Sequence, residues 1–210
     1  MQGDGDGWVV SDSGGHYWGR YGAAGLLLRA PMPDGTPAVL LQHRAVWSHQ
    51  GGTWALPGGA RDSHETPEET AVREAHEEAG LVAERIAVRA TVVTAEVSGR
   101  GGTSWSYTTV VADADELLQT VPNRESAEMR WVGEDEVADL PLHPGFAASW
   151  QLLHTVPATV PLDRGDERRQ RLPRTMEIEG GLFVWCMPGD LDHAPPHLSP
   201  RISLLLRALN

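Results

Sequence analysis

The chain has 210 residues, of which 40% are hydrophobic, so it is long enough for one α/β domain with an appendage and too apolar for wholesale disorder. Its 17 basic and 29 acidic residues give a net charge of −12, which disfavours binding to nucleic acid or to an anionic membrane surface. A single cysteine excludes an intramolecular disulfide, and no apolar run approaches the roughly 20 residues of a membrane span, so we expect a cytoplasmic protein without a membrane or nucleic-acid partner.

The first half of the sequence predicts two strands, a loop and a helix. Residues 23–30 form a short apolar run that suits a buried strand, and residues 38–44 form the next strand. The turn residues between these runs predict a hairpin. Residues 48–63 are rich in glycine and are expected to be loop, whereas residues 66–79 have the pattern of a helix.

Beyond this helix the pattern returns to strands. β-Branched residues predict two longer strands at residues 85–97 and 104–112, joined by a turn. We expect a short strand at residues 129–132, followed by short helices at residues 133–140 and 146–154.

The balance of charge divides the chain near residue 155. Residues 1–155 contain 10 Arg and 22 acidic residues, whereas residues 156–210 contain seven of each. We therefore predict an N-terminal lead-in without regular structure (1–19), a main domain (20–155) and a C-terminal extension (156–210). A homodimer interface is one role left open for the extension, which is short for an independent domain. Its expected elements are a linker, a strand at residues 181–187 and an apolar helix at residues 202–209.

The helix at residues 66–79 has clear start and stop signals. Thr66 suits the N-cap, Pro67 the first helical position, and Glu69 completes a capping box with Thr66. Gly80 suits the C-terminal stop. On this helix, Val72, Ala75 and Ala79 are expected to face the core.

Three glutamates of this helix converge on one side. Glu74, Glu77 and Glu78 stand at i, i+3 and i+4, and their mutual repulsion near the negative end of the helix dipole is unfavourable. A bound divalent cation would remove both penalties, and carboxylate oxygens suit Mg²⁺ or Mn²⁺. Gly58 and Gly59, just before the helix, allow positive φ angles and close approach of the backbone to a ligand, with an ordinary tight turn as the alternative.

The passage resembles the signature of the Nudix family. That signature is Gly, five residues, Glu, seven residues, then Arg-Glu-apolar-X-Glu-Glu-X-Gly-apolar. Gly59 and Glu65 stand at its first two fixed positions, and REAHEEAGL, from Arg73 to Leu81, completes it. Every fixed position is matched, with Ala75 at an apolar position. We call residues 59–81 the box; the preceding WALPGG also resembles the family's approach to it.

The resemblance implies an α/β fold, namely an α/β/α sandwich with a mixed sheet and a loop–helix–loop catalytic motif. It implies hydrolysis of a nucleoside diphosphate linked to another group. Metal ions would neutralise phosphate oxygens and lower the pKa of bound water, and a glutamate would take the remaining proton. The sequence leaves open which glutamate this is.

The resemblance also implies roles for individual residues. Glu74, Glu77 and Glu78 would hold the Mg²⁺ or Mn²⁺ ions, and Arg73 would orient a carboxylate by an ion pair. Glu65 would brace the motif. The metal-site positions also include Gly59, and the structural positions of the box are Gly59, Glu65 and Gly80.

Further candidates lie outside the box. In the family a Glu six residues before a Trp frequently reaches the metal, and Glu125 stands there, with Glu128 as the second choice. Arg44 matches phosphate oxygens chemically, and a surface ion pair is its alternative role. Trp54 offers a ring for a base, with packing as the alternative, and Gly58 is a further substrate-binding candidate.

The substrate class is narrowed by elimination. Motifs typical of NADH, coenzyme A and ADP-ribose hydrolases are not found, which favours a (d)NTP or oxidised-nucleotide pyrophosphohydrolase. An ADP-ribose or other nucleotide-sugar pyrophosphatase and a non-catalytic nucleotide-binding regulator stay as alternatives. An isomerase of the isopentenyl diphosphate type is disfavoured, because the only cysteine, Cys186, lies far downstream of the helix.

Overall fold

The computed structural model describes residues 3–98, 104–154, 174–178 and 182–186. The chain divides into two compact units, residues 1–161 and 162–210. In the second unit, β10 (Arg174–Ile178) and β11 (Leu182–Cys186) form an antiparallel pair. Strand β11 corresponds to the strand expected at residues 181–187, whereas the helix expected at residues 202–209 lies outside the described residues.

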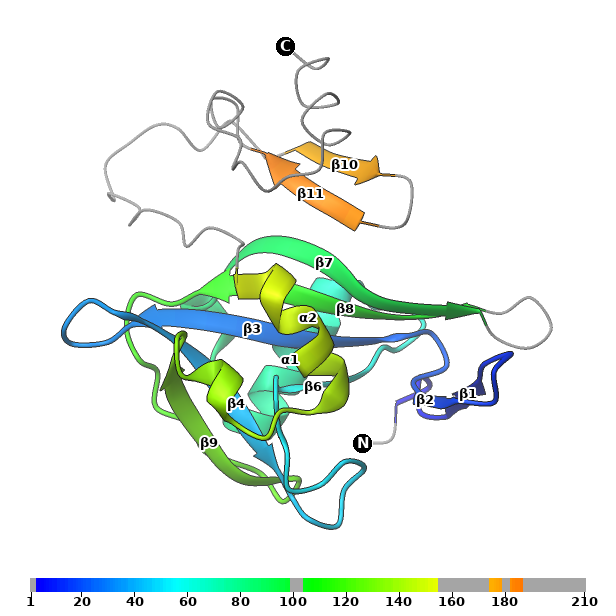
Figure 1. The fold of residues 1–210 in the computed structure, drawn as a ribbon, viewed down its shortest axis with the longest axis horizontal. Coiled ribbons are helices and arrows are strands. Elements are labelled where there is room, and N and C mark those ends of the chain that lie inside the picture. Colours follow the sequence, from blue (N-terminus) through cyan, green and yellow to red (C-terminus); the bar gives the residue numbers. More distant parts are fainter. Residues whose placement is uncertain (1–2, 99–103, 155–173, 179–181, 187–210) are drawn as a thin grey trace. The chain divides into compact units, whose positions relative to one another are not determined.

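The first unit is built on a mixed seven-stranded sheet (Figure 1). Its main path runs β5-β4-β3-β8-β7, with β6 paired to β3 and β9 paired to β4. Strands β3 and β8 are parallel, and the other neighbours are antiparallel. The strands are β3 (Ala23–Pro31), β4 (Pro37–Arg44), β5 (Trp54–Ala55), β6 (Gly58–Ala60), β7 (Ala87–Ser98), β8 (Ser104–Asp113) and β9 (Ser126–Gly133). The predicted hairpin of β3 and β4 is present.

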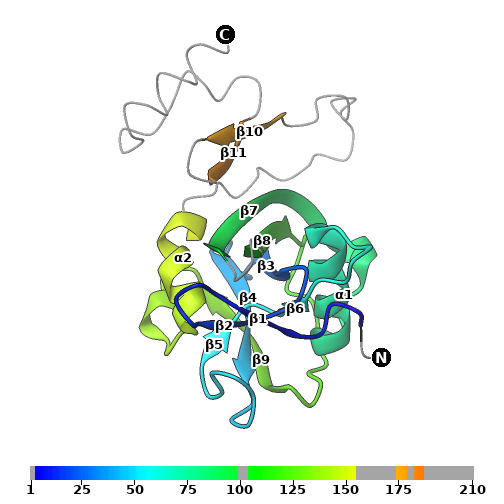
Figure 2. The same cartoon turned by 90° about the vertical axis from the view of Figure 1, so that its right-hand side faces the viewer.

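Two helices cover the sheet, α1 (Pro67–Ala79) and α2 (Pro144–His154). They lie on opposite faces, with α2 to the left and α1 to the right in Figure 2. One side of β3 packs with α1 in an apolar core that includes Leu26, Leu28 and Ala75, all fully buried. The predicted α/β/α sandwich is confirmed.

A buried arginine fastens α2 to the other face of the sheet. Arg29 on β3 is 3% exposed; its Nη2 donates to the carbonyl of Leu153 at 2.9 Å, and its Nε donates to Glu134 at 2.5 Å. Because Arg29 alternates with Leu26 and Leu28 along the strand, one strand supplies an apolar contact to α1 and a polar contact to α2.

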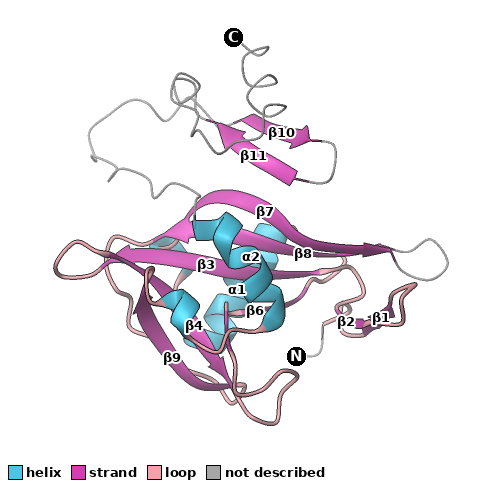
Figure 3. Cartoon of the chain, viewed as in Figure 1, coloured by secondary structure: helices cyan, strands magenta, loops and turns pink. Residues whose placement is uncertain are grey.

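The N-terminal segment differs from the expectation of a lead-in without regular structure. It contains the hairpin of β1 (Trp8–Val10) and β2 (His16–Trp18) (Figure 3). The Trp105 indole on β8 donates to the Trp18 carbonyl at 2.9 Å. Asp4 accepts hydrogen bonds from the backbone and hydroxyl of Ser63 at 2.9 and 2.6 Å. The segment is therefore attached both to the sheet and to the loop before α1.

Two further expectations need correction. The glycine-rich stretch at residues 48–63 contains strands β5 and β6, because its backbone pairs with β4 and β3. The helix expected at residues 133–140 is only a 3-10 turn, η3 (Val137–Asp139). In the part of the chain that is described, no helix is long and apolar enough to cross a membrane.

Candidate active site

Helix α1 begins and ends as its sequence predicts. The Thr66 hydroxyl accepts from the Glu69 N–H at 3.2 Å, and the Glu69 carboxylate accepts from the Thr66 N–H at 2.8 Å, which forms the capping box. Gly80 ends the helix in the left-handed region, with φ of 68°. These two caps fix which turn of the helix presents the glutamates.

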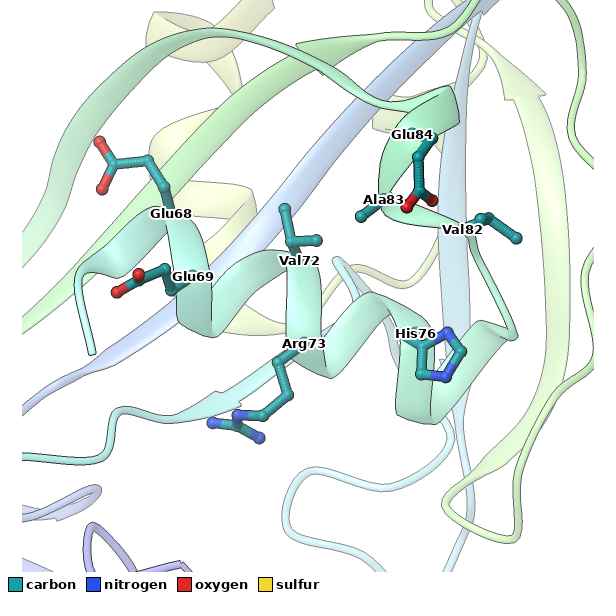
Figure 4. A pocket seen from close by; sticks show the side chains of 8 residues that line it. All are labelled: Glu68, Glu69, Val72, Arg73, His76, Val82, Ala83 and Glu84. Atoms are coloured by element: carbon teal, nitrogen blue, oxygen red, sulfur yellow. The ribbon is translucent and has the colours of Figure 1, made fainter. Parts of the chain in front are cut away.

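The buried face of α1 differs in one residue from the prediction. Ala71, Ala75 and Ala79 are fully buried, whereas Val72 is only partly buried. Val72 lines an open hollow of about 600 Å³ between the outer face of α1 and the turn η1 (Ala83–Arg85) (Figure 4). The other lining residues are Glu68, Glu69, Arg73, His76, Val82, Ala83 and Glu84. Glu74, Glu77 and Glu78 do not line this hollow, so it is separate from the carboxylate cluster.

Glu78 is buried and held at both carboxylate oxygens. Glu78 is 4% exposed. Oε1 accepts from Nε2 of Gln42 at 3.0 Å, and Oε2 accepts from the backbone N–H of Gly58 at 2.8 Å. Burial raises the pKa of Glu78 to about 8, and the negative charges of Glu74 and Glu125 add to this, against the two hydrogen bonds. Among the described residues, only neutral donors bind this carboxylate. When it is ionised, its negative charge has no cationic partner there, so a bound cation would stabilise it.

Arg73 joins the loop before α1 to the helix. Its Nε and Nη2 donate to the two oxygens of Glu65 at 2.6 and 3.0 Å, and Nη2 also donates to the Ala60 carbonyl at 3.0 Å. Its Nη1 donates to Glu74 at 2.8 Å. The hydrogen bond from Arg73 lowers the pKa of Glu65 to about 2, so Glu65 is ionised at neutral pH. Arg73 thus links Glu65 and the Ala60 carbonyl, before the helix, to Glu74 on the helix.

Glu74 lies against Gly59. Its side chain is 15% exposed. A Cβ on Gly59 would lie 2.5 Å from Oε1 of Glu74, so only glycine leaves room for the carboxylate. Burial raises the pKa of Glu74 above its ordinary value, although Arg73 acts in the opposite direction. The three carboxylates are therefore not all unpaired, because Arg73 binds Glu74.

Gly58 and Gly59 are needed for close approach, but not for positive φ. Both lie in the extended strand β6, and neither has a φ in the left-handed region. A Cβ on Gly58 would lie 2.4 Å from the Ala24 carbonyl oxygen on β3. The positive φ angles that glycine allows are not used at either position, and the Gly58 N–H binds Glu78.

Glu77 and the candidate Glu125 are exposed, unlike Glu78. The Glu77 side chain is 54% exposed, and one of its oxygens lies 3.9 Å from Arg73 Nη1. Glu125 is exposed, and its charge acts on both Glu74 and Glu78. Glu128, the second choice, instead binds Arg130 through both oxygens at 2.8 and 2.9 Å.

The substrate-binding candidates Arg44 and Trp54 differ in their surroundings. The charge of Arg44 acts on Tyr107 and His143, and its Nε donates to the His49 carbonyl at 3.0 Å. Trp54 is 5% exposed, His43 stacks on it at 4.7 Å, and the Arg130 guanidinium lies 4.7 Å from its ring centroid. Trp54 therefore has no exposed ring face on which a nucleotide base could stack.

Comparison with known proteins agrees with this geometry. The family model described as "NUDIX domain" matches residues 20–155. The chain belongs to the Nudix family. A Mycobacterium tuberculosis protein named "Putative 8-oxo-dGTP diphosphatase 3" is 80% identical over 206 residues, which cover 98% of this chain and 95% of that protein. The predicted Nudix membership is confirmed, and with it a hydrolase that acts on phosphoric anhydride bonds.

Two further relatives give the extent of the likeness. The crystal structure of a Nudix hydrolase from M. smegmatis, RenU, has a TM-score of 0.72 and 73% identity, and covers 75% of this chain and 100% of its own. A Bifidobacterium longum protein, named as a nucleoside triphosphate pyrophosphatase/Nudix hydrolase fusion, is 40% identical over 70% of this chain and 30% of its own length.

Nudix hydrolases generally use divalent metal ions, and the described side chains fit such an ion. The donors at this site are carboxylate oxygens, which hard divalent cations prefer. Glu78 is buried without a cationic partner among the described residues, and Gly59 keeps the space beside Glu74 clear of a side chain. A divalent cation would offset the cost of burying these charges.

The sequence analysis did not single out Gln42, which binds Glu78, or Tyr107, on whose phenol the charge of Glu78 acts. Gln42 on β4 is fully buried; its Nε2 binds Glu78 and the Ser126 hydroxyl, and its Oε1 has no partner. The sequence does contain a signal for Gln42: it is a polar residue two positions after Leu40, on the apolar face of the same strand. Tyr107 on β8 offered no signal of this kind, because only the fold brings it near Glu78.

Proposed function

We propose that this Nudix protein is a nucleoside triphosphate pyrophosphohydrolase, with an oxidised purine deoxynucleotide such as 8-oxo-dGTP as its substrate. The support for the substrate is the name of the M. tuberculosis relative, which is 80% identical over 98% of this chain. The support for the chemistry is the intact box and its buried carboxylates.

The proposed ion is Mg²⁺, with Mn²⁺ as a substitute. Glu74, Glu77 and Glu78 would hold it, with Glu125 and the backbone of Gly59 as further candidates. When bound, the ion neutralises charge on the phosphate oxygens and lowers the pKa of attacking water.

The residues of the chain supply position and proton transfer. Arg73 fixes the Glu74 carboxylate, while Gln42 and Gly58 fix both oxygens of Glu78, so neither acid must reorganise during the reaction. The Arg44 guanidinium would hold a phosphate oxygen of the substrate. A glutamate of the cluster would accept the proton of the attacking water.

The observation that carries this proposal is the burial of Glu78 between neutral donors, with Glu74 and Glu125 close enough to raise its pKa. A carboxylate serving only as a solvated helix face would lie in water instead. The alternative of a non-catalytic regulator has no comparable support, because every carboxylate of the box is present and positioned.

The test is a panel of nucleotides with product identification. We expect 8-oxo-dGTP to be cleaved with a higher kcat/KM than dGTP, ADP-ribose or a nucleotide sugar, with activity lost in EDTA and restored by Mg²⁺. Full activity in excess EDTA would refute the metal-dependent mechanism. Preference for ADP-ribose would refute the substrate class alone.

A further inference from the structure

We propose that Tyr107 is a substrate-binding residue, whose phenolic hydroxyl donates a hydrogen bond to a phosphate oxygen of the nucleotide. This inference rests on the nucleotide substrate proposed above. It assigns a role to a residue outside the box.

The hydroxyl of Tyr107 occupies space that Gly25 leaves free. Tyr107 on β8 lies opposite Ala23 of β3, and its hydroxyl reaches to Gly25, two residues further along β3. A Cβ on Gly25 would lie only 2.0 Å from the hydroxyl oxygen. Gly25 pairs with Gly58 of β6, and the Gly58 N–H holds Glu78. The glycine that leaves room for the hydroxyl is therefore the pairing partner of the glycine whose N–H binds the buried glutamate.

No described residue forms a hydrogen bond with this hydroxyl. The backbone carbonyl of Tyr107 accepts from the Thr94 hydroxyl at 3.4 Å, and its ring lies 6.4 Å from that of Trp105, but the phenolic oxygen has no protein partner in the described part of the chain. Among the described residues, Oε1 of Gln42 is the only buried polar side-chain atom without a partner, so the Tyr107 hydroxyl is open to solvent. It is therefore free to donate to an acceptor supplied by a ligand.

The charges around the hydroxyl match an anionic ligand. Burial raises the pKa of Tyr107 above its ordinary value; the negative charge of Glu78 adds to this, and Arg44 acts in the opposite direction. The phenol therefore stays protonated and can only gain by donating to a negatively charged oxygen. Arg44 supplies a second donor in the same region, and guanidinium groups bind phosphate oxygens well.

A phosphate is the part of a nucleotide that fits these neighbours. The hydroxyl lies against Gly25, which pairs with Gly58, and the Gly58 N–H binds the proposed metal ligand Glu78. The metal ligands require the phosphates nearby, whereas a base would bring apolar surface to a place with two acids and an arginine. The contact is therefore expected to be the same for every base.

The experiment compares Tyr107→Phe with the wild-type chain by calorimetric titration of non-hydrolysable α,β-methylene nucleoside triphosphates in Mg²⁺. Loss of a hydrogen bond to a charged acceptor should raise Kd by roughly ten-fold or more. The factor should be equal for guanine, adenine and cytosine analogues. The melting temperature of the unliganded variant should be unchanged, because the hydroxyl has no hydrogen-bond partner among the described residues to lose.

Tyr17→Phe is the matched control. Tyr17 also contacts the Trp105 ring, at 4.8 Å, but it lies on the N-terminal hairpin, so the same chemical change should leave Kd unaltered. An unchanged Kd in Tyr107→Phe, or a loss confined to one base, would overturn the phosphate contact. A lower melting temperature with unchanged Kd would show a packing role instead.

The two proposals can fail separately. If the wild-type chain hydrolyses nucleotides and Tyr107→Phe binds them equally well, only the role of Tyr107 is wrong. If the wild-type chain hydrolyses and binds no nucleotide, the proposed function is wrong, and the same titration with Mg²⁺-pyrophosphate then decides whether Tyr107 binds phosphate.

Discussion

Gln42 and Glu78 face each other beneath the box, with Nε2 of Gln42 donating to Oε1 of Glu78 at 3.0 Å. Gln42 is fully buried and Glu78 is 4% exposed, so water cannot replace this contact easily. The Ser126 hydroxyl lies 2.9 Å from the same Nε2 and fixes the amide. Strand β4 and the start of β9 thus position a carboxylate that the sequence places on α1.

The first prediction follows from this contact. Gln42→Leu should weaken Mg²⁺ binding by about 10–100-fold, because Glu78 loses a donor that orients it. The Mg²⁺ concentration that gives half-maximal activity measures the effect. Gln119→Leu, at an exposed position, is the control and should leave that concentration unchanged. Equal Mg²⁺ dependence in both variants would mean that Gln42 only fills space.

The second prediction concerns the acids themselves. Glu77→Gln and Glu78→Gln should each lower kcat by more than the roughly 10–100-fold typical of an indirect partner, with the fold intact. In EDTA above pH 8, where Glu78 is ionised, the melting temperature of each variant should rise slightly, because like charges no longer repel at the end of the helix. Glu84→Gln, on the far side of the hollow, should change neither quantity. Wild-type turnover in Glu77→Gln would remove that residue from the metal site.

The third prediction is the pH dependence of the metal-free protein. The pKa of Glu78 is about 8 in the folded state and 4.5 ordinarily, so the folded state binds the extra proton between these values. The free energy of unfolding in EDTA should therefore fall as pH rises from 4.5 through 8. Denaturant unfolding across this range measures it, and Glu78→Gln should flatten the profile. An identical slope in wild type and variant would contradict the shift.

The fourth prediction concerns Glu65, whose effect on stability changes with pH in the opposite direction. The pKa of Glu65 is about 2 in the folded state, so the stability that comes from its ion pair is present above pH 4.5 and is lost as pH falls through 2. Arg73→Met should reduce the loss of stability over this acid range, since Glu65 then titrates nearer its ordinary pKa. Arg85→Met, which removes an exposed pair with Glu116, should leave the acid profile as in wild type.

The fifth prediction tests the packing of Tyr107 against Gly25. Gly25→Ala should destabilise the fold by a few kcal/mol, because its Cβ would lie 2.0 Å from the hydroxyl oxygen. In the double variant with Tyr107→Phe, the nearest ring atom, Cζ, would lie 3.1 Å from the new Cβ at position 25. Part of the lost stability should therefore be recovered. A double-mutant cycle by thermal unfolding measures this coupling. Strictly additive effects would show that the hydroxyl does not occupy that space.

The sequence by itself determined the helix and the identities of the box residues. Thr66, Pro67, Glu69 and Gly80 set the limits of α1 through local hydrogen bonds and backbone preferences, which depend only on neighbouring residues. The strands β3, β4, β7 and β8 were also predictable, because continuous apolar or β-branched runs need burial whatever their partners are. The spacing of the box then gave the family.

Tertiary structure decided how the carboxylates differ. From sequence, Glu74, Glu77 and Glu78 are equivalent acids on one side of a helix. In the fold, Glu78 is buried against Gln42 and Gly58, Glu74 is paired with Arg73, and Glu77 is exposed. Arg73 is the sequence neighbour of Glu74, but Gln42 and Gly58 lie on strands distant from Glu78 in sequence, so no local pattern encodes the burial of Glu78.

The same reason explains the remaining errors. The N-terminal hairpin depends on Trp105 and Ser63, and the short strands β5 and β6 depend on edges offered by β4 and β3. Neither segment has enough apolar periodicity to indicate a strand alone. The sequence determines which chemical groups are available. Long-range pairing decides which of them are buried, which are paired, and which lie beside one another at the site.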